Sequence, residues 1–159
     1  MIEELNEEYM RLAIKQARKN ISNLDGGPFG ACIVKDSEIL AVARNLVLVR
    51  DATSHAEINA IRAASRRMKS FDLSGCVIYS TTEPCPMCFS AIHWARISMI
   101  VYGTAIVDVK KLGFNELTIS NEKMKDIGNS NIKIIPGFLL EECASILKEW
   151  DSLGSKVFY

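Results

Sequence analysis

His55, Glu57, Cys85 and Cys88 are of the residue types that bind metal ions and move protons, and they lie in two short segments. Cys85 and Cys88 form a Cys-x-x-Cys pair, which lets two thiolates reach one metal ion but also occurs in redox-active dithiols. With His55 as a third ligand, a tetrahedral zinc ion keeps one open position for water, as in catalytic sites. The sequence therefore predicts one Zn²⁺ per chain, held by His55, Cys85 and Cys88.

Glu57 is the predicted proton carrier of this site. Zinc lowers the pKa of a bound water toward about 7, which generates a nucleophile at neutral pH. Because Glu57 follows His55 by two positions, its carboxylate is expected to hydrogen-bond this water rather than to bind the metal. It would accept a proton from the water, pass it to a ring nitrogen and help an exocyclic amine to leave as ammonia. A redox domain or a structural zinc domain is the alternative interpretation.

The remaining cysteines and the second histidine have simpler explanations. Cys32, Cys76 and Cys143 lie in apolar segments and are predicted to be small buried side chains. His93 is predicted to be a polar residue of a helix rather than a fourth ligand. An odd total of five cysteines is a poor disulfide framework, which favours reduced thiols and a cytoplasmic protein.

The composition is that of an ordinary globular protein. The chain has 159 residues, of which 48% are hydrophobic and 24% charged, and this length predicts one domain over residues 1–159. Nineteen basic residues balance nineteen acidic ones, whereas proteins that bind phosphate backbones usually carry a basic excess. We therefore expect no nucleic-acid partner. The acidic start and the lack of a long apolar run predict neither a signal peptide nor a membrane span.

Helical and strand patterns alternate along the chain, which predicts an α/β fold with helices on both faces of one sheet. Both metal-binding motifs lie at predicted helix starts, where the helix dipole stabilises thiolates. The region Asp108–Gly128 is the least regular, with room for one short helix. The predicted helices are Leu5–Asn20, His55–Arg67, Cys85–Trp94 and Leu139–Leu153, and the predicted strands are Ala31–Lys35, Ile39–Arg44, Val77–Ser80, Met99–Tyr102 and Ile132–Ile135.

The two motifs together resemble the signature of the zinc-dependent cytidine/deoxycytidylate deaminase superfamily, and the resemblance extends over nearly the whole chain. It implies a three-layer α/β/α sandwich around a five-stranded mixed sheet, with zinc between two helix N-termini. It also implies a homodimer. Bacterial guanine deaminases and tRNA adenosine deaminases both carry these motifs. The guanine branch is favoured by similarity at Gly26–Ala31, Pro86, Trp94–Arg96 and Gly113–Glu116, and by the final Tyr159.

The resemblance implies five substrate-binding residues. Phe29 matches an aromatic wall on which a planar base stacks, and Asn45 matches an asparagine that hydrogen-bonds the base. Ala56 lies within the His-Ala-Glu motif, and Glu116 stands where guanine deaminases have an aspartate. Tyr159 belongs to a tail, 155–159, that would close the active site of a partner subunit. Exchange of C-terminal segments between the two subunits is one way to achieve this.

The predicted reaction is hydrolysis of guanine to xanthine and ammonia. Glu116 is one methylene longer than the aspartate it replaces, and the loop Leu46–Arg50 is one residue shorter than in the bacterial guanine enzymes. These departures leave guanosine, another aminopurine, or a related heterocycle such as cytosine open as alternative substrates. Deamination of a tRNA anticodon adenosine is a further alternative. It is disfavoured because the C-terminal residues 148–159 are not predominantly basic, unlike those of tRNA deaminases.

Overall fold

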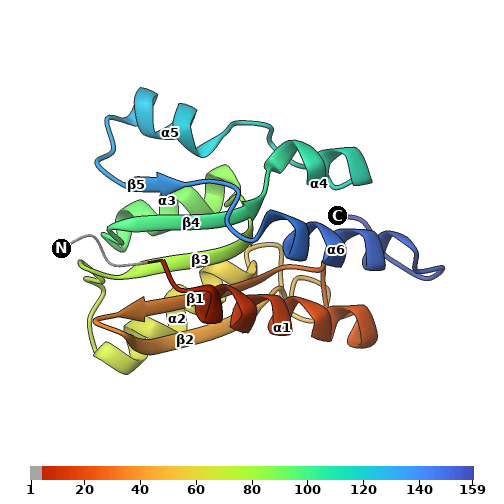
Figure 1. Ribbon diagram of the computed structural model, residues 1–159, viewed down its shortest axis with the longest axis horizontal. Coiled ribbons are helices and arrows are strands. Elements are labelled where there is room, and N and C mark those ends of the chain that lie inside the picture. Colours follow the sequence, from red (N-terminus) through yellow and green to blue (C-terminus); the bar gives the residue numbers. More distant parts are fainter. Residues whose placement is uncertain (1–4) are drawn as a thin grey trace.

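A five-stranded mixed sheet forms the middle layer of the computed structural model, which describes residues 5–159 (Figure 1). Residues 1–4, part of the acidic start on which the expectation of no signal peptide depends, lie outside this range. The strand order is β2-β1-β3-β4-β5; β1 is antiparallel to β2 and β3, whereas β3, β4 and β5 are parallel. The strands are β1 (Gly30–Lys35), β2 (Glu38–Arg44), β3 (Val77–Thr82), β4 (Met99–Thr104) and β5 (Lys133–Ile135).

Helices cover both faces of the sheet, as predicted. One face packs against α1 and α6, and the opposite face packs against α2, α3 and α5 (Figure 1). This arrangement confirms the predicted three-layer α/β/α sandwich. The helices are α1 (Glu7–Asn23), α2 (Ala56–Met68), α3 (Pro86–Trp94), α4 (Ile106–Leu112), α5 (Asn121–Gly128) and α6 (Leu140–Asp151).

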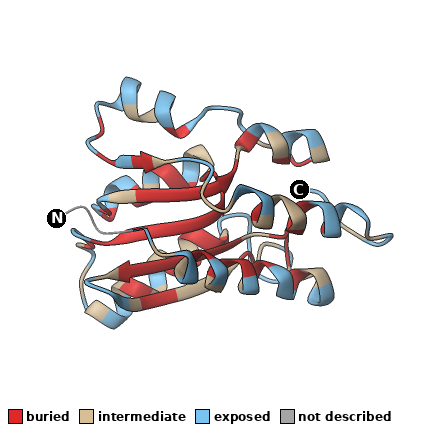
Figure 2. Cartoon of the chain, viewed as in Figure 1, coloured by how far each residue is buried: buried red, intermediate tan, exposed pale blue. Residues whose placement is uncertain are grey.

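Alternation along the central strands builds two cores. In β1, Ala31 and Ile33 join the cluster under α2 and α3, whereas Cys32 and Val34 join the cluster under α1 and α6. Successive side chains of a strand point to opposite faces, so a strand covered on both sides must be apolar throughout. Figure 2 shows the resulting buried central strands between helices whose outer faces are exposed.

The irregular region 108–128 holds more regular structure than the sequence pattern indicates. It contains most of α4 and the whole of α5, where only one short helix was expected. The helix α4 has seven residues, and its N-cap residue is Ala105 rather than a Ser, Thr, Asn or Asp; the Asp108 side chain accepts the Ala105 N–H, at 3.1 Å. Both helices are short, so they are stabilised by packing against the rest of the fold rather than by their own sequences. The sequence pattern therefore predicts them only weakly.

Within residues 5–159, no helix is long and apolar enough to cross a membrane. The loops that lead into α2 and α3 bring the two predicted motif segments to neighbouring helix N-termini.

Candidate active site

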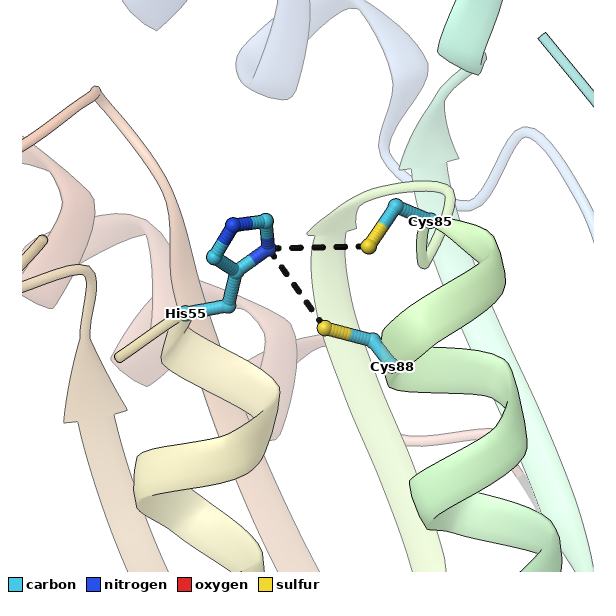
Figure 3. A group of neighbouring side chains, drawn as sticks. All are labelled: His55, Cys85 and Cys88. Atoms are coloured by element: carbon cyan, nitrogen blue, oxygen red, sulfur yellow. Dashed lines mark hydrogen bonds between the residues drawn. The ribbon is translucent and has the colours of Figure 1, made fainter. Parts of the chain in front are cut away.

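The three predicted metal ligands meet between the N-termini of α2 and α3. His55 Nδ1 lies 3.6 Å from Cys85 Sγ and 3.5 Å from Cys88 Sγ, and one ligand atom from each residue lies within 4.8 Å of the others. Figure 3 shows His55 pointing from the start of α2 toward both thiols on α3. Two sulfurs and one imidazole nitrogen at this spacing fit the donor set of a zinc site with one open position.

Local backbone geometry presents these ligands. His55 and Cys85 are the N-cap residues of α2 and α3, both in extended conformation. In the described chain neither side chain makes a capping hydrogen bond, so both remain directed toward the site. Pro86 occupies the first turn of α3, where its fixed φ suits a helix start. Cys88 follows in the same turn and is fully buried.

The two cysteines differ in charge. Hydrogen bonding from Cys88, aided by His55, lowers the pKa of Cys85 to about 4, although burial opposes this shift. Burial raises the pKa of Cys88 well above its usual range, and the neighbouring Cys85 adds to the increase. Burial works against charging of His55, but the hydrogen bond with Cys85 and the charge of Glu57 raise its pKa overall. The surroundings therefore favour the thiolate form at Cys85 more than at Cys88.

Glu57 lies beside the ligand group, buried to 6% exposure. Its Oε1 accepts a hydrogen bond from Ser80 Oγ at 2.9 Å, and its Oε2 accepts one from the Cys88 thiol at 3.5 Å. Burial, together with Cys85, raises the pKa of this carboxyl. A carboxyl beside the metal ligands, with its pKa raised by burial, is placed to exchange protons with a water bound there.

A pocket of about 210 Å³ opens onto this group. Its lining includes His55, Glu57 and Cys85, together with four of the five predicted substrate residues: Phe29, Asn45, Glu116 and Tyr159. Ala56 lies outside the lining, because its side chain is fully buried in the core between α2 and the sheet. His93 is exposed, and Cys32, Cys76 and Cys143 are buried as expected, away from the ligand group.

Asn45 is held rigidly at the end of β2. It is 1% exposed, its Oδ1 accepts the Val47 N–H at 3.0 Å, and its backbone carbonyl accepts from Asn20 Nδ2 at 2.7 Å. Its carbonyl and side-chain oxygens therefore anchor the loop, and its side-chain NH₂ lies at the pocket, where it hydrogen-bonds the Tyr159 hydroxyl.

Glu116 is half-buried on the segment between α4 and α5. Burial first, and the neighbouring Cys85 second, raise the pKa of its carboxyl to about 7. A second carboxyl therefore lines the pocket, besides Glu57.

The C-terminal tail lies against the pocket of its own chain. Tyr159 Oη accepts the Gly27 N–H at 2.9 Å, and its backbone carbonyl accepts the Asn115 N–H at 2.9 Å. Its ring packs edge-on against Phe114, 5.4 Å between centroids, and burial raises the pKa of its hydroxyl. The resemblance implies that this tail closes a partner's site; in this single chain Phe158 and Tyr159 of the tail pack on Phe114.

Sequence reasoning missed several buried polar residues that hold the site. Asn20 Nδ2 donates to the carbonyls of Gly27 and Asn45, at 2.8 and 2.7 Å, and Asn59 Nδ2 donates to the Arg44 carbonyl at 3.0 Å. Asn20 could have been suspected, because it continues the buried stripe of α1 that contains Ala17. Ser80 and Glu83, which lie in apolar or loop sequence, carry no comparable signal.

Comparisons with known proteins agree with this geometry. The profile of the "Cytidine and deoxycytidylate deaminase zinc-binding region" matches residues 3–104. The chain is 35% identical to a guanine deaminase of Bacillus subtilis over 155 residues, covering 97% of this chain and 99% of that protein. It is also 35% identical to a tRNA-specific adenosine deaminase of Buchnera aphidicola over 144 residues, covering 89% and 91%.

Solved structures of both kinds of enzyme, guanine deaminases and tRNA deaminases, are also similar to this chain. The guanine deaminase of Nitrosomonas europaea superposes with a TM-score of 0.83 at 28% identity, covering 94% of this chain and 86% of that one. A tRNA:A34 deaminase superposes with a TM-score of 0.76 at 30% identity, covering 89% and 99%. Family and donor set together confirm a zinc-dependent hydrolytic deaminase. The chain belongs to the cytidine and deoxycytidylate deaminase family.

Proposed function

We propose that this protein deaminates guanine hydrolytically, giving xanthine and ammonia. The observation that carries the proposal is the position of Tyr159, which lines the same pocket as the metal ligands and hydrogen-bonds Gly27 through its hydroxyl. A pocket narrowed by an aromatic side chain of the C-terminal tail suits a free planar base better than a nucleotide within a polynucleotide, which must be splayed out of its strand to reach an active site.

The residues of the pocket suit recognition of a purine. Phe29 offers a ring face for stacking, and Asn45 offers side-chain hydrogen bonds to the base edge. Guanine presents several N–H donors, and the carboxylate of Glu116 can accept them. The longer side chain of Glu116, compared with an aspartate, would reach the same edge from slightly farther away.

Proton transfer falls to Glu57. Zinc held by His55, Cys85 and Cys88 supplies Lewis-acid activation of water. Glu57 accepts a proton as the oxygen of this water bonds to the carbon that carries the amine, and delivers it to the adjacent ring nitrogen. Glu57 would then take the second proton from the added hydroxyl and give it to the amine; the carbon–nitrogen bond breaks as the carbonyl double bond forms, and ammonia leaves. Ser80 keeps the carboxylate directed toward the site throughout.

Deamination of adenosine in tRNA is the second candidate, because the chain is equally similar to a tRNA-specific deaminase. The zero formal net charge argues against it, since tRNA binding draws on phosphate neutralisation.

Ammonia release from guanine, guanosine, cytosine, cytidine, adenosine and tRNA, measured with zinc-loaded protein, tests the proposal. We expect turnover of guanine alone, abolished in Glu57→Gln, which should keep its zinc. Turnover of tRNA with no release from guanine would instead support the second candidate.

The oligomeric state belongs to the same proposal. We infer one deaminase domain over residues 1–159 that acts in the cytoplasm as a homodimer. The exposed Trp94 on α3, at 79%, supports a subunit interface on this helix. Sedimentation of the wild type and of Trp94→Asp tests it: a dimer that dissociates in the variant supports the inference, and a monomeric wild type contradicts it.

A further inference from the structure

Glu83 is a buried carboxylate directly before Pro84 and the ligand Cys85, exposed to 6%. Its Oε2 accepts the Ile106 N–H at 3.0 Å, and its Oε1 accepts the Asn121 N–H at 2.7 Å. These donors are the first residues of α4 and α5. One side chain thus binds the N-termini of two helices that are separated in sequence.

The segment between these two attachment points lines the pocket. It contributes residues Phe114–Leu117, including Glu116, to the wall facing the metal ligands. Asn121 strengthens the attachment, because its Nδ2 donates to the Pro84 carbonyl at 2.6 Å. Both ends of the segment are therefore tied to the two residues that precede Cys85.

The two hydrogen bonds of Glu83 should contribute substantially to holding the segment in place. Each bond joins an ionised acceptor to a backbone N–H that lacks a partner within its own helix. Both donors are buried, so water cannot readily replace the carboxylate. The backbone of Glu83 is also held, since its N–H donates to the Thr104 carbonyl at 2.7 Å, so a side-chain change need not move Cys85.

We propose that Glu83 is a positioning residue that sets the distance between Glu116 and the metal ligands, and through this distance the binding of the substrate. The proposal rests on the proposed function only where it names guanine and Glu116 as the recognised pair. Whatever the substrate, loss of the two Glu83 hydrogen bonds should loosen the segment 106–121.

Amide hydrogen exchange tests the attachment without substrate. Glu83→Gln preserves shape, but one of the two N–H donors then faces an NH₂ group. We expect exchange within 106–121 to accelerate about tenfold or more, as for loss of a hydrogen bond to a charged group, while β3 and α2 stay protected and zinc content stays near one per chain. Glu122→Gln, the same change on the exposed surface of α5, is the control and should leave exchange unchanged.

Two variants at Asn121 distinguish its backbone hydrogen bond to Glu83 from its side-chain hydrogen bond to Pro84. Asn121→Ala removes the contact with Pro84 but keeps the N–H, whereas Asn121→Pro removes both. Proline is tolerated at a first helical position, and Ser120 before it already has an extended ψ of 156°. We expect faster exchange in Asn121→Pro than in Asn121→Ala. Equal exchange in these two variants, or unchanged exchange in Glu83→Gln, overturns the attachment.

Kinetics test the link to Glu116. Glu83→Gln should raise KM for guanine about tenfold or more and lower kcat less, because Glu57 and the ligands lie outside the released segment. In a Glu116→Gln background the same change should have a much smaller effect, as for residues that act together. Additive effects would overturn the positioning role. A wild type inactive on guanine would overturn the proposed function, and the exchange results would still decide whether Glu83 holds the segment.

Discussion

The hydroxyl of Tyr159, the last residue, accepts a hydrogen bond from the backbone N–H of Gly27 at 2.9 Å, across 132 positions of sequence. Gly27 lies in the loop before β1, whose conformation Asn20 holds through the Gly27 carbonyl. Tyr159 is thus bonded to the loop that leads to Phe29, and both residues line the pocket.

Removing this contact should weaken substrate binding more than folding. Tyr159→Phe loses the hydrogen bonds of the hydroxyl, so kcat/KM should fall about tenfold. Deletion of residues 157–159 also removes the rings packed on Phe114, so the loss should be larger and the melting temperature should drop. Ser155→Ala, a change on the exposed part of the tail, is the control. Normal kcat/KM in the deletion variant would show that the tail has no part in the pocket.

Glu57→Gln should lower kcat by a factor of about 10² to 10⁴, because the amide cannot carry the proton. Zinc content should stay unchanged, since His55, Cys85 and Cys88 form the ligand group without it. Metal analysis and single-turnover kinetics on the same preparation check both statements. Parallel loss of zinc and activity would instead make Glu57 part of the metal site.

The stability of the zinc-free protein should depend on pH through Glu57. Burial raises the folded-state pKa of this carboxyl, so folding favours its protonated form. The resulting stabilisation is fully present below the unfolded-state pKa of about 4.3 and is lost as pH rises through the folded-state pKa. Zinc-free Glu57→Gln should therefore be more stable than the zinc-free wild type at neutral pH. Urea unfolding with a chelator, at acidic and neutral pH, measures the difference; a wild type as stable as the variant at neutral pH would contradict it.

Ser80→Ala should lower kcat about tenfold with zinc retained. The hydroxyl donates to Glu57 Oε1 at 2.9 Å, and its loss leaves a buried carboxylate oxygen without this partner. Ser152→Ala, on the surface after α6, serves as the control in steady-state kinetics. An unchanged kcat would mean that Glu57 is directed by its other contacts.

Zinc affinity should fall as the pH is lowered. Zinc requires neutral His55 and two thiolates, and the pKa values of His55 and Cys88 are both raised, so protons compete with the metal at these atoms. Cys85, with a pKa of about 4, contributes little to this competition near neutral pH. Competition with a chelator of known pH dependence measures the slope. A zinc affinity independent of pH between about 5.5 and 8 would contradict these protonation states.

The zinc ligands and the fold class could be predicted from the sequence because they depend on local spacing, and the same spacing brings Glu57 beside the ligands. His55 and Cys85 are helix N-caps, so the residues around them carry both the chemistry and the helix start. The buried strands were equally clear, because a strand covered on both faces must be apolar.

Residues that act across the fold could not be predicted in this way. Nothing near Glu83 in the sequence indicates that it binds the first residues of α4 and α5. In the same way, the residues around Asn20 do not indicate that its side chain binds the carbonyls of Gly27 and Asn45. Only the resemblance to a known family indicated Tyr159. Its ring contact with Phe114 and its hydrogen bond with Gly27 are seen only in the folded chain. The sequence by itself determined the reaction chemistry, since that chemistry lies in two short motifs. The tertiary structure decided the shape of the pocket, because its walls are joined by hydrogen bonds and ring contacts between residues far apart in the chain.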